Sequence, residues 1–358
     1  MTGQPMTGQP MTGQPMTGQP LLDVRDLKVS FRTEDGLVKA VDGVSLSLFE
    51  GETLGIVGES GSGKSVTMMS VMRLINDPNA RFEGQVLYKG RDLMTLNPEQ
   101  MREIRGTGIA MIFQDPMTSL NPVYRVGWQI AEQIRAHENV SKQAARARAI
   151  ELLAAVGIPQ ANHRVDNYPH EFSGGMRQRV MIAMAVSCHP DILIADEPTT
   201  ALDVTIQAQI LTLLRKLRDD FGTAVVLITH DMGVVADMAD RIAVMYAGRI
   251  VEQGSRREVF YDAQHPYTWG LLGSIARLDR PKPRRLATIP GQPPSLLRLS
   301  PGCAFGDRCT HRFDLCDERP PLLARVDGDH LDACHLEPKQ KKELRETTIH
   351  PELIGNAE

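Results

Sequence analysis

A glycine-rich stretch of the chain has the residue types and spacing that bind nucleotide phosphates. Residues 58–65 read GESGSGKS and follow the pattern G-x-x-x-x-G-K-[ST]. Glycines let such a loop wrap closely and point backbone N–H groups at phosphate oxygens. Lys64 would reach the β- and γ-phosphates, and the hydroxyl of Ser65 would bind Mg²⁺. The predicted phosphate-binding residues are Gly58, Glu59, Ser60, Gly61, Ser62, Gly63, Lys64 and Ser65.

Two adjacent carboxylates form a second candidate site. Residues 191–198 read DILIADEP, so Asp196 and Glu197 follow four apolar residues that predict a buried strand. Ligands of α/β sheets bind at the carboxyl ends of the strands. Asp196 could hold Mg²⁺ through water, and Glu197 could polarise an attacking water as general base. Alone, the pair could be an acidic turn after a core strand, but together with the glycine-rich loop it indicates nucleotide hydrolysis.

A third group of residues could also bind an anion. Ser173, Gly174 and Gly175 stand at the start of a predicted helix, where backbone N–H groups are free. Taken alone, this stretch is more typical of an ordinary helix cap.

Strands and helices alternate around these residues. The glycine-rich loop lies between a predicted strand, Thr53 to Val57, and a predicted helix, Lys64 to Ile75. Strands are predicted near the N-terminus at 22–31 and 44–48, and further apolar runs of strand length at 109–113, 192–195, 224–228 and 242–246. Helical patterns cover 126–137, 141–156, 174–188 and 204–220. The alternation predicts an α/β domain with a mainly parallel sheet, and residues 116–190 a helical insertion without strands.

The order of these motifs resembles the nucleotide-binding subunits of ABC transporters over about residues 21–260. GESGSGKS is similar to the Walker A loop, SGGMR at 173–177 to the signature motif and ILIADE at 192–197 to the Walker B strand. Met176 stands where the signature more often has Gln, with little loss of hydrolysis expected. The further matching residues are Gln114 of the Q-loop, Asp203 of the D-loop, His230 as the switch histidine and Phe31 as the aromatic that stacks on adenine.

This resemblance implies a fold and a mechanism. We expect a P-loop NTPase core of the RecA-like type at 21–262, with an antiparallel β subdomain and a helical subdomain at about 116–190. Two subunits would sandwich ATP, so that Ser173 and Gly175 serve the nucleotide of the partner. The resemblance implies that hydrolysis depends on Glu197, His230 and Gln114, and that Ser65, Gln114 and Asp196 bind Mg²⁺.

Four cysteines near the C-terminus have the spacing C-x5-C-x6-C-x17-C and are Cys303, Cys309, Cys316 and Cys334. The spacing leaves three interpretations open: an iron–sulfur cluster, a structural zinc site or unrelated thiols. Cys188 is expected to be a core thiol.

HPYT at 265–268, TIPGQPPS at 288–295 and the cysteines resemble the C-terminal extension of dipeptide and oligopeptide permease ATPases. That resemblance implies a [4Fe–4S] cluster on the four cysteines and an extension at 263–337. The polar segment 338–358 is expected to be a loose tail.

The family resemblance predicts the ATP-hydrolysing subunit of a bacterial importer of di- and oligopeptides. Its partners would be a second ATPase subunit, often a different one, two transmembrane permease subunits and an extracytoplasmic substrate-binding protein. Alternative cargoes are nickel, D-amino-acid dipeptides, glutathione and opines. A soluble ABC ATPase without a transport role is a more distant alternative.

Composition restricts the possible classes of function. The 358 residues carry a formal net charge of −4, which argues against nucleic acid as a partner. The longest uninterrupted apolar run, Val180 to Val186, is too short to cross a membrane. Residues 1–20 repeat MTGQP, which predicts a disordered tail, and they lack the features of a signal peptide. The lack of signal-peptide features favours the cytoplasm, and the family resemblance implies a peripheral protein on the cytoplasmic face of the inner membrane.

Overall fold

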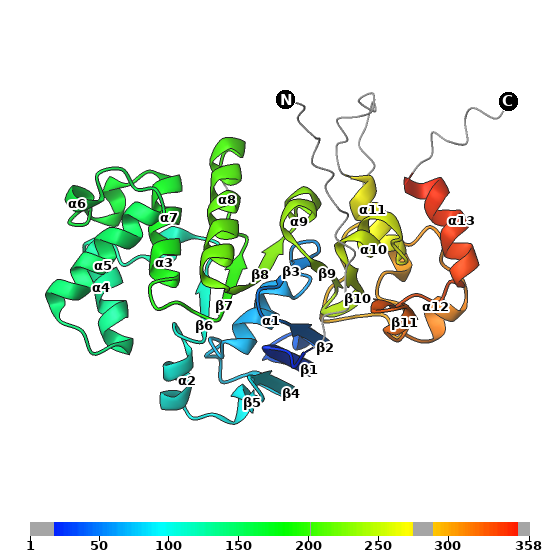
Figure 1. Cartoon of the computed structure of the whole chain (residues 1–358). Helices are drawn as coiled ribbons and strands as arrows, with labels where there is room; N and C mark the ends of the chain where they lie inside the picture. The colour runs from blue at the N-terminus through cyan, green and yellow to red at the C-terminus, as the bar shows by residue number, and fades with distance from the viewer. Residues whose placement is uncertain (1–17, 201, 275–288, 350–358) are drawn as a thin grey trace, which may run out of the picture.

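Two β-sheets position the predicted site residues in the computed structural model, which describes residues 18–200, 202–274 and 289–349 (Figure 1). The MTGQP repeats up to residue 17 and Thr288 lie outside these ranges. The first sheet is antiparallel, and buried apolar side chains recur on one face of its strands. In spatial order its strands are β2 (Gly36–Leu48), β1 (Leu22–Thr33), β4 (Ala80–Tyr88) and β5 (Arg91–Asp92).

The second sheet has eight strands, and its central strands are parallel and almost entirely buried. The parallel part consists of β9 (Arg241–Tyr246), β3 (Thr53–Val57), β8 (Ala224–Thr229), β7 (Ile192–Asp196) and β6 (Ile109–Ile112). Continuous apolar runs form these strands because both faces of the sheet are covered. The prediction of an α/β domain with a mainly parallel sheet is confirmed for this part of the chain.

Helices separate the strands along the chain, as expected. Those outside both the insertion and the C-terminal end are α1 (Lys64–Val71), α2 (Pro98–Ile104), α8 (Val204–Phe221) and α9 (Met232–Met238). The insertion contains only helices and gathers at one side of the molecule (Figure 1). Its helices are α3 (Pro116–Ser119), α4 (Val126–His137), α5 (Lys142–Ala155), α6 (Ala161–Arg164) and α7 (Gly174–Ala185). None of the helices in the described ranges combines the length and apolar character needed to cross a bilayer.

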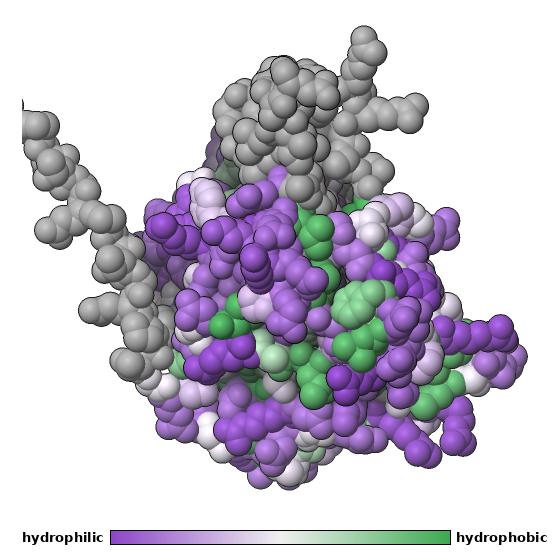
Figure 2. All heavy atoms as spheres, turned by 90° about the vertical axis from the view of Figure 1, so that its right-hand side faces the viewer, coloured by the Kyte–Doolittle hydropathy of each residue, from purple (hydrophilic) through white to green (hydrophobic). Residues whose placement is uncertain are grey.

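The C-terminal extension lies at the opposite side of the molecule from the helical insertion (Figure 1). It continues the large sheet, because β12 pairs with β10 in antiparallel register and β11 pairs with β12. Its surface is mostly hydrophilic, with separate hydrophobic areas (Figure 2). The elements at this end are β10 (Arg249–Ser255), α10 (Arg256–Tyr261), α11 (Pro266–Gly273), α12 (Leu315–Glu318), β11 (Ala324–Asp327), β12 (His330–Asp332) and α13 (Pro338–Ile349).

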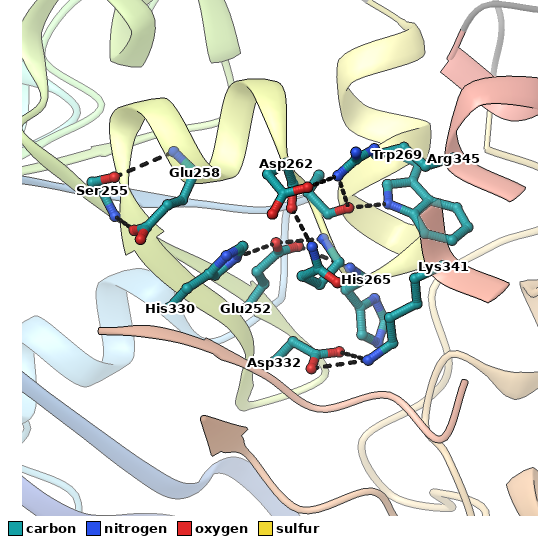
Figure 3. Close-up of polar contacts among 12 residues, drawn as sticks. Glu252, Ser255, Glu258, Asp262, His265, Trp269, His330, Asp332, Lys341 and Arg345 are labelled. Atoms are coloured by element: carbon teal, nitrogen blue, oxygen red, sulfur yellow. Dashed lines mark hydrogen bonds and ion pairs between the residues drawn. The ribbon is translucent and has the colours of Figure 1, made fainter. Parts of the chain in front are cut away.

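The expectation of a loose segment after Glu337 is wrong for residues 338–349, which form α13. Polar contacts hold this helix against the extension (Figure 3). The buried ammonium of Lys341 lies 2.8 and 3.0 Å from the carboxylate oxygens of Asp332, and Arg345 pairs with Asp262. A search for apolar periodicity misses such a helix because ion pairs anchor much of it.

Candidate functional site

The glycine-rich loop connects β3 to α1 and has a backbone that only glycine fits at two positions. Gly58 has a φ of 153°, and a Cβ atom there would lie 2.2 Å from the carbonyl oxygen of Met245. Gly63 has a φ of 102°, and its Cβ would lie 2.5 Å from the carbonyl oxygen of Ala40. The close approach of neighbouring backbone therefore explains two of the glycines of the motif.

Lys64 is buried at the first position of α1, with its ammonium turned back into the loop. Its Nζ atom donates hydrogen bonds to the carbonyl oxygens of Gly58 at 2.8 Å and Glu59 at 2.9 Å. Burial lowers the pKa of Lys64, while the charges of Glu197, Asp196 and Glu59 act in the opposite direction. The loop thus holds a cation next to the N-terminus of a helix, the arrangement that binds phosphate.

Ser65 and Asp196 meet at the carboxyl end of β7. The Ser65 hydroxyl donates to Oδ1 of Asp196 at 2.9 Å. Burial raises the pKa of Asp196, an effect that the Ser65 hydrogen bond opposes and the charge of Glu197 reinforces. These oxygen groups suit Mg²⁺, which takes one or two protein ligands and completes its shell with water and substrate phosphates.

Glu197 is the centre of a group of polar side chains. It has a φ of 46°, an unusual conformation for a non-glycine residue that often marks a functional position. Its Oε2 atom accepts from Nε2 of Gln114 at 3.3 Å and from Oγ1 of Thr200 at 2.8 Å. Nδ1 of His230 lies 3.4 Å from the same oxygen. The predicted catalytic residues are therefore adjacent, and Thr200 is a contact that the sequence analysis did not identify.

One cavity of about 1000 Å³ brings most of the predicted residues together. The whole glycine-rich loop lines it, as do Gln114, Glu197 and His230. Phe31 of β1 does not line this cavity and packs partly against the core beneath the antiparallel sheet. Its proposed stacking on adenine stays a prediction, as does the coordination of Mg²⁺ by Gln114.

The signature residues lie apart from this cavity and cap helices. The Ser173 hydroxyl accepts from the backbone N–H of Met176 at 3.4 Å at the start of α7. Asp203 likewise caps α8, accepting from the N–H of Ile206 at 3.0 Å. A Cβ atom on Gly175 would lie 2.8 Å from Cγ2 of Ile206, which explains that glycine. Ser173 and Gly174 are exposed, and their role toward the nucleotide of a partner stays a prediction.

The four C-terminal cysteines are free thiols that line one small cavity. They come from the 3₁₀ turn and loop around Gly306–Arg308, from α12 and from the segment after β12, and the fold brings these together. Among the described residues, no three His, Cys, Asp or Glu side chains are placed to hold a single metal ion. Cys188 is buried after α7, in agreement with the expected core thiol.

Comparisons with known proteins agree with this site. A family model described as "ABC transporter" matches residues 41–200, and one described as "Oligopeptide/dipeptide transporter, C-terminal region" matches residues 251–316. The chain is 50% identical to the oligopeptide transport ATP-binding protein OppD of Bacillus subtilis, covering 94% of this chain and 98% of that protein. It is 51% identical to the dipeptide transport ATP-binding protein DppD of the same organism, with the same coverage of both chains.

Solved structures give the same result for the fold. A dimeric ATP-binding cassette in a post-hydrolysis state with ADP and phosphate superimposes with a TM-score of 0.59 at 28% identity. The match covers 66% of this chain and 99% of that one. A dimeric bacterial ABC transporter cassette gives a TM-score of 0.59 at 29% identity, with the same coverage. The chain therefore belongs to the ABC transporter family and has the C-terminal region of its oligopeptide/dipeptide transporters.

Proposed function

We propose that this chain is the ATP-hydrolysing subunit of a bacterial ABC importer that takes up di- and oligopeptides. The observation that carries this proposal is the single cavity shared by the glycine-rich loop, Gln114, Glu197 and His230. The named transport functions of relatives that are 50% identical over nearly their whole length supply the cargo class.

The residues of the cavity have complementary roles in hydrolysis. The loop N–H groups and Lys64 bind the phosphates of ATP, and Ser65 and Asp196 hold Mg²⁺. The metal ion, when bound, neutralises the negative charge that develops on the phosphates. Glu197 accepts a proton from the attacking water, with Gln114 and His230 orienting its carboxylate.

The proposed importer also contains partner subunits. The exposed Ser173 and Gly174 would face the nucleotide of a second ATPase subunit, identical or different. Two transmembrane permease subunits and an extracytoplasmic substrate-binding protein would supply the pathway and the cargo. The chain then works at the cytoplasmic face of the inner membrane, with residues 21–262 as ATPase domain, 263–337 as extension and 338–358 as its C-terminal segment.

We also propose a [4Fe–4S] cluster on Cys303, Cys309, Cys316 and Cys334. Its support is the cavity that all four thiols line and their position on three separate segments. Each thiolate of such a cluster binds a different iron atom, so the four sulfur atoms need not surround one ion. Anaerobically purified protein should contain iron and absorb broadly near about 400 nm. Protein with neither iron nor this absorbance would contradict the cluster.

Reconstitution tests the transport function. The chain is purified with its permease subunits, placed in ATP-loaded vesicles, and supplied with the binding protein and a radiolabelled peptide outside. We expect peptide uptake that stops when Lys64→Ala replaces the wild-type chain. Uptake of nickel, D-amino-acid dipeptides, glutathione or opines in place of peptides would overturn the cargo class while keeping the ATPase. ATP hydrolysis that never drives uptake would favour an ABC ATPase without a transport role.

A further inference from the structure

The C-terminal extension contacts the nucleotide-binding loop directly, at Glu59. The backbone N–H of Glu59 donates to the hydroxyl of Tyr267 on α11 at 2.8 Å. Its carboxylate accepts two hydrogen bonds from Arg308, from Nη1 to Oε2 at 2.5 Å and from Nη2 to Oε1 at 3.0 Å. Arg308 thus makes a bidentate ion pair, the geometry that gives guanidinium–carboxylate contacts their specificity.

Contacts other than those with Glu59 also fix the side chain of Arg308. Its side chain is only 5% exposed, whereas that of Glu59 is 28% exposed. Its Nε atom donates to the carbonyl oxygen of Pro290 at 2.8 Å, and its Nη1 atom lies 3.4 Å from the Tyr246 hydroxyl. The rings of Tyr246, Tyr267 and Phe305 pack together beside it, with centroids 4.7–5.4 Å apart. A guanidinium fixed in this way loses little side-chain freedom when it pairs with Glu59.

These contacts use every polar group of Glu59. Its N–H is bound by Tyr267, its carboxylate by Arg308, and its carbonyl oxygen by the ammonium of Lys64 at 2.9 Å. The position of the Glu59 backbone therefore depends on two residues that lie 208 and 249 positions further along the chain. The same ion pair neutralises a carboxylate whose charge acts on Lys64 and would otherwise repel the phosphates of a nucleotide.

The extension also forms part of the wall of the nucleotide cavity. Leu271, Ile289 and Leu296 line it together with the glycine-rich loop. Arg308 ends a short 3₁₀ turn, Gly306–Arg308, and the next residue is Cys309, one of the four clustered cysteines. The segment that carries the cysteines is thus connected to the nucleotide loop through the buried side chain of Arg308.

We propose that Arg308 is a positioning residue for nucleotide binding. It holds Glu59, and through it the glycine-rich loop, in the conformation that accepts ATP, and it removes the repulsion of the Glu59 carboxylate. ATP affinity then depends on whether the cysteine-bearing segment is folded. This inference rests on the proposed ATPase function.

The test compares steady-state ATP hydrolysis by the full chain with its partner subunits for wild type, Arg308→Ala, Arg308→Lys, Glu59→Gln and the double variant. We expect Arg308→Ala to raise KM for ATP about tenfold, with kcat reduced less than about threefold, because a charged hydrogen-bonded pair is lost. Arg308→Lys should restore part of the affinity. Glu59→Gln removes the repelling charge and the charged partner of Arg308 together, so the KM of this variant is the reference for the double variant. In the Glu59→Gln background, Arg308→Ala should change KM for ATP by less than about threefold.

Arg312→Ala is the matched control. Arg312 stands on the same segment, but it is exposed and pairs with Asp307 and Asp317, away from the cavity. An unchanged KM for Arg308→Ala would overturn the proposal. An equal rise in KM caused by Arg308→Ala in the wild-type and in the Glu59→Gln background would also overturn it. A purely structural role of Arg308 does not depend on the charge of Glu59. If Arg308→Ala does not fold, Arg308→Lys in the two backgrounds gives the same comparison. A wild-type complex without ATP hydrolysis would instead contradict the proposed function itself.

Discussion

The hydroxyl of Ser65 donates a hydrogen bond to Oδ1 of Asp196 over 2.9 Å, across 131 positions of sequence. This contact joins the first turn of α1 to the carboxyl end of β7. The glycine-rich loop and Asp196 therefore form one site, and Glu197 lies directly beside it.

Asp196→Asn tests the metal role of this pair. The change keeps the shape of the side chain but removes the charge that attracts Mg²⁺, so we expect ATP hydrolysis to fall at least about 100-fold. Raising the Mg²⁺ concentration should restore part of the activity. Asp191→Asn, just before the opposite end of β7, is the control and should behave as wild type. An unchanged Mg²⁺ dependence in Asp196→Asn would contradict this role.

Thr200→Val tests the contact that the sequence did not reveal. The Thr200 hydroxyl donates to Glu197 at 2.8 Å, and valine keeps the shape without the donor. We expect kcat to fall about tenfold with little change in ATP affinity, because the carboxylate loses a group that orients it. Thr200→Ser should retain most of the activity. Steady-state phosphate release measures both, and equal activity of Val and Ser variants would show that the hydroxyl has no such role.

Lys341→Met tests the anchoring of α13. It leaves the buried carboxylate of Asp332 without its partner, so we expect the free energy of unfolding to fall by about 3 kcal/mol. Replacing Asp332 by Leu as well should recover much of this loss, because an apolar pair needs no compensating charge. Lys342→Ala, exposed on the same helix, is the control. Denaturant unfolding measures all of these, and a loss for Lys342→Ala equal to that for Lys341→Met would refute the anchoring.

His330 predicts a pH dependence of stability. Burial acts to lower its pKa, but the hydrogen bond to Glu252 at 2.8 Å and the charges of Glu252, Glu258 and Asp262 outweigh burial and raise it (Figure 3). Because the pKa of His330 is raised in the folded state, its charged pair with Glu252 stabilises the folded protein fully at pH values below the ordinary histidine pKa of 6.5. This stabilisation is lost as the pH rises through the folded value.

Unfolding measured from about pH 6 to about pH 9 should therefore show a stability loss in wild type that His330→Gln lacks. Parallel pH curves for the two proteins would rule out His330 as the cause.

The sequence predicted the parts of the fold whose signals are local. β3 spans Thr53–Val57, the range that its apolar run predicted, and the glycine-rich loop follows it. The predicted helix from Lys64 to Ile75 was too long, because α1 ends at Val71 and Arg73 adopts a φ of 50°. β4 was not predicted, since Gly84 and several polar residues interrupt its pattern.

Other features depend on contacts between distant segments and have no local signal. Tyr267 lies in the HPYT motif that the sequence analysis singled out, but nothing in the motif indicated contact with a loop 208 positions earlier. Arg308 stands among many polar residues of the extension, and only the folded chain brings it to Glu59. Motifs predicted the groups that would bind ATP, whereas the contacts of Tyr267 and Arg308 with Glu59 required the structure.

The ATPase activity of Glu197→Gln tests whether Glu197 is the general base of ATP hydrolysis. Glutamine keeps the size of the side chain and can still be hydrogen-bonded by Thr200 and Gln114, but it cannot accept a proton from water. We expect this variant to bind ATP as wild type does, to accumulate as a closed dimer and to hydrolyse ATP at least about 100-fold more slowly. Undiminished hydrolysis by Glu197→Gln would show that Glu197 is not the general base.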